Sequence, residues 1–236
     1  MKTLVPIFLF MPLLGCVNQS VRTHEQVVNM GDKAVSMVKL DDNRFKIGNI
    51  LVDKRERYFE VTGKFIRTEP PIEFLAVAQG GDRGYESLLE LNVNVYEFNL
   101  ACILIGLDAH KGTPPSMHFD PKPVEGDAVE ISLSWETNGK AYQYDASDFF
   151  QFDDKKLTPG EWVYTGSRFL PEGKYLPEVS GGTLIGFVHD PGSIIEHRYG
   201  FGDGSYSRLT LNPALIPPEN TPLKVHFNYA GNTLDQ

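Results

Sequence analysis

Residues 80–108 read GGDRGYESLLELNVNVYEFNLACILIGLD. Asn94 and Glu97 have the spacing of a capping box, in which each side chain accepts a hydrogen bond from a backbone N–H at the start of a helix. Apolar residues then cover nearly the whole circumference, and Gly106 offers the left-handed residue at which many helices end. A helix that is apolar on almost all sides has to be buried. The sequence therefore predicts one buried helix at about residues 95–105.

The remainder of the chain is dominated by strand patterns. In Asp127–Trp135 apolar and polar residues alternate, so successive side chains lie on opposite faces of a strand. Asn138-Gly139 is a preferred pair for a tight hairpin turn, and Lys140–Tyr144 returns as the partner strand. Further strands are predicted at Tyr58–Ile66, Ile72–Ala78, Glu161–Phe169 and Glu178–Val188. Many strands with one helix predict a single α+β domain over about residues 43–230, in which a mostly antiparallel sheet packs around the buried helix.

A long irregular segment follows the predicted helix. Residues 108–126 contain four prolines and show no periodicity. Loops of this length inside a compact domain are often functional, so this loop is a candidate wall of a site.

Composition narrows the class of protein. The chain has 236 residues, of which 41% are apolar, and this is typical of an ordinary globular protein. It carries 22 Lys and Arg against 31 Asp and Glu, for a net charge of −9. No basic surplus is present to neutralise a phosphate backbone. Nucleic acid is therefore not expected as a partner.

The start of the chain has the pattern of an export signal. Lys2 is followed by the apolar run Leu4–Leu14, which is too short to span a bilayer as a permanent helix. Residues 13–16, LLGC, resemble the lipobox of bacterial lipoproteins, in which the cysteine after the cleavage site receives lipid. We therefore expect a signal peptide at residues 1–15, lipid on Cys16, and a domain exported and anchored to the membrane of the bacterial cell envelope. The alternative is a cleaved secretory signal in which Cys16 is incidental.

The segments that flank the domain are polar. Residues 16–42 predict a tether, with a short helix near Lys33–Lys39, and residues 231–236 predict a short tail. Lipid on Cys16 would leave Cys102 as the remaining thiol, so no internal disulfide could form. The position of Cys102 on the apolar helix indicates a small core side chain rather than a nucleophile.

Several segments, taken in order along the chain, resemble the YdjY domain family of exported bacterial proteins. They are Tyr58–Gly63 (YFEVTG), Glu86–Leu88, Ile105–Leu107, Val129–Trp135 with its hairpin, Glu161–Phe169 (EWVYTGSRF), Leu211–Pro213 and Pro217–Leu223 (PPENTPL). The resemblance implies an exported protein with this domain, and it implies no particular activity. Members often have a histidine immediately before the Glu-Ser pair, where this chain has Tyr85. That difference argues against a metal or proton-transfer role at this position.

Metal binding has no local motif in this chain. The histidines are His24, His110, His118, His189, His197 and His226. None of them lies three to five residues from another histidine or from a cysteine, so a transition-metal site would have to be assembled wholly by the fold. We expect no metal and no cofactor.

The polar candidates for a site fall into two segments. They are Tyr85, Glu86, Ser87, Tyr164, Ser167 and Arg168. A glycine precedes Ser167 and could expose its hydroxyl, although Phe169 stands where a nucleophile elbow has its second glycine. Arg168 could bind a carboxylate or phosphate of a ligand, or form a surface ion pair with one of the many acids.

Aromatic residues are concentrated in the second half of the chain. Eight of them fall between Tyr142 and Phe169. Flat rings suit the binding of sugar or peptide as well as the packing of a sheet core. Core packing is the simpler interpretation of the set, and one or two exposed rings would suffice for a ligand platform.

These patterns allow three functions. Export, a tether and the lack of a recognisable catalytic motif predict a domain that binds a ligand or partner, such as an envelope protein or a glycan, without catalysis. The alternative is a hydrolase acting on envelope material, with Glu86, Ser87, Ser167 and Arg168 as its polar groups. The third is a structural partner in a cell-surface assembly. An enzyme should gather these groups in one pocket, a binding module should show exposed rings along a groove, and a scaffold should show a broad apolar patch.

Overall fold

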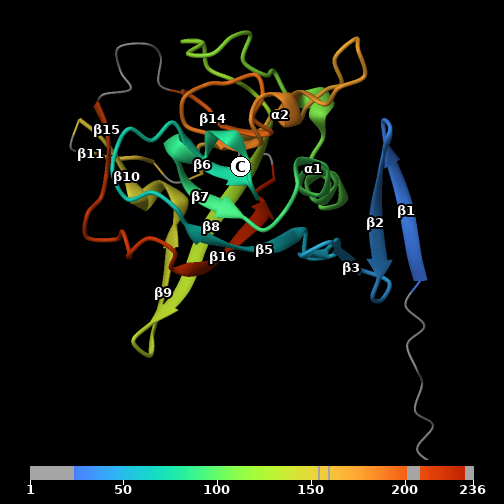
Figure 1. Cartoon of the computed structure of the whole chain (residues 1–236), viewed down its shortest axis with the longest axis horizontal. Coiled ribbons are helices and arrows are strands. Elements are labelled where there is room, and N and C mark those ends of the chain that lie inside the picture. Colours follow the sequence, from blue (N-terminus) through green and yellow to red (C-terminus); the bar gives the residue numbers. More distant parts are fainter. Residues whose placement is uncertain (1–23, 154, 159, 201–207, 232–236) are drawn as a thin grey trace, which may run out of the picture.

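The computed structural model describes residues 24–231 except residues 154, 159 and 201–207 (Figure 1). Strands account for 43% of the described residues and helices for 14%. The helices in the described residues are α1 (Val95–Leu104), α2 (Leu176–Val179) and the 3₁₀ helices η1 (Asp82–Glu86), η2 (Ala109–Lys111) and η3 (Ala146–Phe149). None of them has the length and apolar content that a membrane span needs.

The strands are short and numerous. They are β1 (His24–Met30), β2 (Lys33–Lys39), β3 (Arg44–Ile47), β4 (Ile50–Asp53), β5 (Tyr58–Phe65), β6 (Phe74–Ala78), β7 (Ser87–Leu91), β8 (Asp127–Thr137), β9 (Lys140–Asp145), β10 (Phe150–Phe152), β11 (Lys155–Lys156), β12 (Trp162–Tyr164), β13 (Thr183–Gly186), β14 (Ile195–His197), β15 (Leu209–Leu211) and β16 (Pro222–Tyr229).

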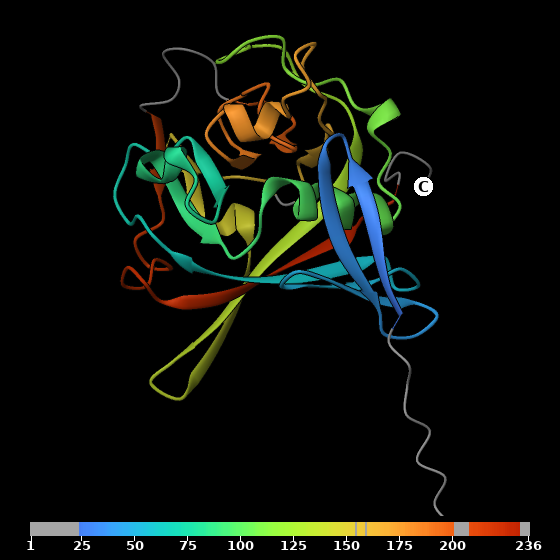
Figure 2. The same cartoon turned by 45° about the vertical axis from the view of Figure 1, so that its right-hand side comes forward.

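Eight of the described strands form a closed barrel. They pair in the order β5–β16–β8–β12–β14–β13–β6–β7, and β7 pairs in turn with β5. Neighbours are antiparallel except for β13 with β14 and β6 with β7. Strands β1–β4 continue the sheet outward from β5 as an antiparallel meander (Figures 1 and 2). Strands β10, β11 and β15 form a separate small sheet.

The expected fold class, an α+β sheet packed around one buried helix, is therefore wrong. The structure is mostly β and closes into a barrel. Alternate side chains of β5, β8 and β16 point inward and are fully buried, as Phe59, Ile131 and Val225 illustrate. A strand pattern shows which side chains share a face, but it does not show which strands pair. Local sequence patterns therefore could not predict that the sheet closes into a barrel.

The predicted helix itself is confirmed as α1. The side-chain oxygen of Asn94 accepts hydrogen bonds from the backbone N–H groups of Tyr96 and Glu97 at 3.0 and 2.9 Å. Glu97 Oε2 accepts one from the backbone N–H of Asn94 at 3.2 Å, which completes the capping box. Most of the helix is buried, but Ile103 is 47% exposed, so α1 is not enclosed on every side.

Helix α1 lies beside the barrel, between it and the β1–β2 hairpin (Figures 1 and 2). Phe98 of α1 meets Phe59 of β5 and Phe227 of β16, with ring centroids 5.6 and 5.3 Å apart and the rings nearly perpendicular. Phe59 and Phe227 also stack on each other at 4.5 Å. This cluster of three rings joins the helix to the barrel core.

Strand β5 is the junction of the fold because it has two partners along one side. Residues 58–60 pair with β4, and residues 63–65 pair with β7. The other side of the strand pairs with β16. β5 and β7 approach closely at Gly63, where an added Cβ would lie 2.4 Å from the carbonyl oxygen of Glu90. A side chain at this position would push β7 away, so the close approach of β5 and β7 requires glycine.

Strands β8 and β9 project from the barrel as a hairpin that we call the arm (Figure 2). The pairing of β16 with β8 reaches Ser134, and β8 continues from there to Thr137 with only β9 beside it. Asn138 and Gly139 at its tip have φ angles of 52° and 72°, as the tight turn between twisted strands requires. The predicted Asn-Gly hairpin is thus confirmed.

One local prediction is wrong, and two are confirmed only in part. Residues 33–39 form β2 rather than a helix, and β2 pairs with both β1 and β3. For residues 178–188 the sequence predicts a strand after a Gly181-Gly182 turn; the strand is present as β13, but the segment begins with the end of α2. The strand predicted at 161–169 covers only Trp162–Tyr164. The error at residues 33–39 arose because a short apolar run suits helix and strand alike.

A glycine-to-alanine pair tests the junction. We expect Gly63→Ala to lower the free energy of unfolding by about 2–3 kcal/mol, because the new methyl group collides with the β7 backbone. Gly84→Ala is the matched control, since its Cβ would meet only Ile66 Cδ1 at 3.5 Å. The control should change stability by no more than about 0.5 kcal/mol. Urea unfolding followed by circular dichroism measures the stability of both variants. Equal losses of stability would contradict the close approach of β5 and β7 at Gly63.

Candidate functional site

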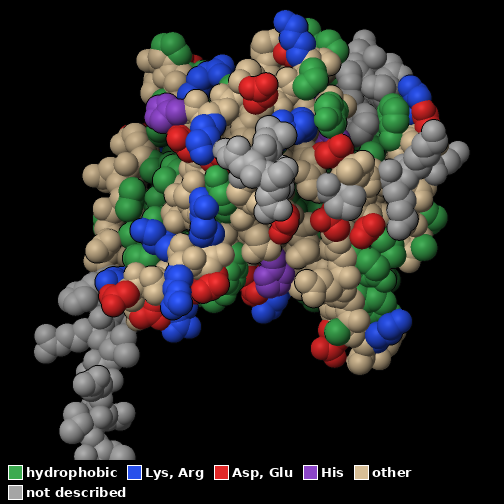
Figure 3. Space-filling model, turned by 180° about the vertical axis from the view of Figure 1, so that it is seen from behind, with side chains coloured by type: hydrophobic (Ala, Val, Ile, Leu, Met, Phe, Trp, Pro, Cys, Tyr) green, Lys and Arg blue, Asp and Glu red, His purple; other side chains and the backbone are tan. Residues whose placement is uncertain are grey.

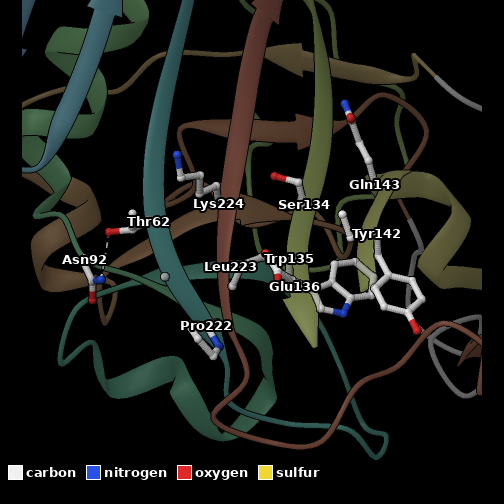
Figure 4. A pocket seen from close by; sticks show the side chains of 12 residues that line it. Thr62, Asn92, Ser134, Trp135, Glu136, Tyr142, Gln143, Pro222, Leu223 and Lys224 are labelled. Atoms are coloured by element: carbon white, nitrogen blue, oxygen red, sulfur yellow. Dashed lines mark hydrogen bonds between the residues drawn. The ribbon is translucent and has the colours of Figure 1, made fainter. Parts of the chain in front are cut away.

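A hollow of about 590 Å³ opens at the base of the arm (Figure 4). We call it the arm groove. Its apolar lining consists of Trp135, Ala141, Tyr142, Pro222 and Leu223. Its polar lining consists of Thr62, Asn92, Ser134, Glu136, Gln143 and Lys224. The groove therefore combines apolar surface with several hydrogen-bonding groups, as binding sites for small molecules do.

The polar side chains come from a row across four strands. Thr62 of β5 is opposite Lys224 of β16, Lys224 is opposite Ser134 of β8, and Ser134 is opposite Gln143 of β9. Directly opposed residues have their side chains on the same face of a sheet. This row lies on the outer face, because the residues next to it in β8 and β16, Leu133 and Val225, are fully buried.

The two rings of the groove are opposed residues on the arm. Trp135 and Tyr142 pair across β8 and β9, and their rings stack with centroids 5.2 Å apart and an interplanar angle of 8°. Trp135 is 8% exposed, whereas Tyr142 is half-buried. Hydrophobic side chains are seen along the projecting arm, with charged side chains at its tip (Figure 3). Tyr142 is thus the ring that a ligand can reach.

The opposite wall of the groove is fixed by a hydrogen bond. Asn92 Nδ2 donates to Thr62 Oγ1 at 3.0 Å, and the Asn92 backbone N–H donates to the Thr62 carbonyl at 2.8 Å (Figure 4). The Lys224 ammonium group pairs with Glu60 Oε1 at 2.8 Å. In contrast, the side chains of Ser134 and Gln143 make no hydrogen bond to any other described residue. These groups are free to bind a ligand.

A second polar centre lies around His118, in the loop over residues 108–126. His118 Nδ1 is 2.9 Å from Asp190 Oδ2, and His118 Nε2 is 3.3 Å from Glu73 Oε2. The hydrogen bond to Asp190, and then that to Glu73, raise the pKa of His118 to about 9. Burial acts to raise the pKa of Asp190, but the hydrogen bonds from His118 and from the Gly192 backbone outweigh it and lower the pKa. His118 is therefore a cation that joins the loop to two carboxylates.

Glu196 lies next to this cluster, and its carboxyl group differs in protonation from that of Asp190. Its Oε1 accepts a hydrogen bond from the backbone N–H of Asp190 at 3.1 Å, and the side chain is fully buried. Burial raises the pKa of the Glu196 carboxyl well above its ordinary value. Glu196 therefore favours the neutral form, while the nearby carboxyl of Asp190 is ionised.

The first group of sequence candidates surrounds Arg83. Arg83 Nη1 donates to Glu86 Oε1 at 2.5 Å and to the Tyr85 hydroxyl at 3.4 Å, and Ser87 Oγ donates to the Arg83 carbonyl at 2.8 Å. Tyr85 is 62% exposed, whereas Glu86 and Ser87 are buried. The Glu86 carbonyl accepts a hydrogen bond from the backbone of Glu73, so this group adjoins the His118 cluster.

The second group packs against α1. The Tyr164 hydroxyl donates to Asn99 Oδ1 at 2.7 Å inside the core, and burial raises its pKa far above the usual range. Ser167 lies against the Tyr175 hydroxyl. Arg168 is exposed and makes no ion pair with another described residue. Among the described residues, no hydrogen bond or ion pair joins this group to Tyr85, Glu86 or Ser87.

None of the six sequence candidates lines the arm groove. The aromatic cluster did include Tyr142, and the alternation of residues 127–135 did place Ser134 on the outer face. Thr62, Asn92 and Lys224 gave no signal, because their proximity depends on pairings between distant strands. In the described part of the chain, no group of three His, Cys, Asp or Glu side chains could hold a metal ion.

The charge of His118 predicts a pH-dependent contribution to stability. Its pKa rises from 6.5 to about 9 in the folded protein, so its contribution is complete below pH 6.5 and is lost as the pH rises through about 9. We expect His118→Gln to lower the urea midpoint clearly at pH 6 and to have little effect at pH 10. His110→Gln, at an exposed position, is the control. A loss that is equal at both pH values would contradict the ion pairs.

The barrel and the arm groove lie within a recognisable sequence family. A model of the YdjY domain matches residues 50–228, from the first residue of β4 into β16. No curated protein and no solved structure matches the chain. The family match extends over more than half of the 236 residues, including every strand of the barrel. The chain therefore belongs to the YdjY domain family.

Proposed function

We propose that this protein is exported, is anchored to the bacterial cell envelope through lipid on Cys16, and binds a glycan in the arm groove without catalysing a reaction. The observation that carries the proposal is the groove itself. Its lining includes the half-buried Tyr142 together with Ser134 and Gln143, whose side chains form no hydrogen bond with another described residue.

A glycan fits this combination better than a peptide does. Sugar rings have apolar C–H faces that pack on aromatic rings, and their hydroxyl groups donate and accept hydrogen bonds around the edge. The groove offers hydroxyl, amide, carboxylate and ammonium groups around its apolar lining. A peptide strand would instead add to a free sheet edge through its backbone. The row of Thr62, Lys224, Ser134 and Gln143 lies on the outer face of paired strands, where backbone hydrogen bonds are already made.

The rest of the polar chemistry supports binding over catalysis. A general base must be unprotonated near the working pH, but His118 is held as a cation between Glu73 and Asp190. The candidates Glu86 and Ser87 lie with Arg83, whereas Ser167 and Arg168 lie elsewhere. The hydrolase alternative would need Glu86, Ser87, Ser167 and Arg168 to act together. A hydrolase would release soluble sugar from the glycan, and we expect none.

Lipid on Cys16 would attach the membrane at the β1 end of the domain. The sequence supports this through the apolar run and the lipobox-like residues 13–16. The net charge of −9 gives no attraction to an anionic membrane surface, so the lipid itself would have to hold the protein there.

Removal of one ring tests glycan binding. We expect Tyr142→Ala to weaken binding to chitin, an uncharged polymer of N-acetylglucosamine, about fivefold, because a stacked ring contributes on the order of 1 kcal/mol. Tyr199→Ala is the control, since Tyr199 is 54% exposed and does not line the groove. Cosedimentation measures binding, and sugar in the supernatant measures hydrolysis. Binding by Tyr142→Ala equal to that of the wild type would contradict the proposal, as would release of sugar.

Replacement of Cys16 tests the anchor. We expect Cys16→Ala to move the protein from the membrane fraction to the soluble fraction, because the thiol that accepts the lipid is gone. Immunoblots of fractionated cells measure this, with Cys102→Ala as the control for loss of a thiol. Cys16→Ala that stays in the membrane fraction would rule out a lipid anchor on this residue.

A further inference from the structure

A second hollow of about 500 Å³ adjoins the arm groove along the same strands. Ser132 and Glu130 of β8, Asp145 of β9 and Asn228 of β16 contribute its polar lining, and Gln143 lines both hollows. We propose that the arm groove and this second hollow form one continuous site for an uncharged or amine-bearing glycan chain of several sugar units, laid along β8. The inference rests on the proposed function, and it adds the length and the charge of the glycan that the site would bind.

Strand register makes the two hollows continuous. Ser134 is opposite Gln143, and two residues further along β8 Ser132 is opposite Asp145. Side chains at alternate positions of a strand share one face, so Glu136, Ser134 and Ser132 follow one another along the outer face, ending with Glu130. The line spans about 20 Å at the rise of a β-strand. A single sugar unit would occupy only part of this length.

The outer face of β8 and its neighbouring strands offers hydrogen-bonding side chains that have no partner within the described protein. The side chains of Ser132, Ser134, Gln143 and Asn228 form no hydrogen bond with another described residue. Residues 132–134 of β8 are held between β16 and β9 by antiparallel pairing, which fixes the backbone that carries these side chains. Groups that are ordered before binding lose little entropy when a ligand arrives. A polymer with hydroxyl groups on every unit can use the whole line.

The charges of the site select against an anionic polymer. Glu130 and Asp145 line the second hollow, and its lining includes no cationic side chain. Lys224, the cation of the arm groove, is paired with Glu60 at 2.8 Å. A carboxylate on each sugar unit would lie near uncompensated negative charge, which disfavours binding. Uncharged units avoid this repulsion, and amines would be attracted.

A series of oligosaccharides tests the length of the site. The probes are N-acetylglucosamine oligomers from dimer to hexamer, titrated by calorimetry into the purified full chain in detergent. We expect the affinity to rise at least tenfold from dimer to hexamer. Ser132→Tyr should abolish this rise by filling the second hollow, and it should leave dimer affinity unchanged. Ala34→Tyr, at an exposed position on β2, is the control for added bulk. Circular dichroism checks that each variant is folded.

The outcomes separate this inference from the proposed function. If dimer and hexamer bind wild type equally, or Ser132→Tyr retains the full rise, the continuous site is wrong while glycan binding in the arm groove stands. If the anionic galacturonate hexamer binds as tightly as the N-acetylglucosamine hexamer, the inference about charge is wrong. If the wild type binds no oligomer of either series, both the continuous site and the proposed function are overturned.

Discussion

The fold depends on the sharing of one edge of β5 between two strands. β4 pairs with the first half of that edge and β7 with the second half, while β16 occupies the other edge. The pairing with β7 closes the barrel, and the pairing with β4 leads the sheet outward into the β1–β4 meander. Both can exist because Gly63 lets the β7 backbone approach where any side chain would collide. Helix α1 then fills the space between barrel and meander, and Phe98 joins it to the core.

Closure of the barrel also fixes the arm groove. Its walls come from β5, β16 and the β8–β9 hairpin, which are distant from one another in the sequence and adjacent in the sheet. Because β16 stops short of the end of β8, the arm projects beyond the barrel and leaves the hollow at its base. The polar row that includes Ser134 and Gln143 is therefore held by paired strands rather than by loops. Such rigid support favours binding, because little order has to be gained when a ligand arrives.

The sequence predicted the features that depend on near neighbours. The capping box of α1 involves residues three apart, and the Asn138-Gly139 turn joins strands that are adjacent in the chain. Barrel closure could not be predicted, because β5 and β7 are linked by a pairing that no local pattern encodes. For the same reason, residue type and the neighbouring Gly166 selected Ser167 and Arg168, which the fold separates from Glu86. Thr62 and Lys224 were missed because only the sheet register brings them together.

Nuclear Overhauser effects between β5 and β7 test barrel closure most directly, since they report distances between backbone protons in solution. The register pairs Gly63 with Leu91 and Phe65 with Leu89. We expect cross-strand effects between these pairs, together with slow amide exchange of the paired N–H groups. An open sheet, with fast exchange along residues 63–65 and no effects to β7, would contradict both the barrel and the support it gives to the arm groove.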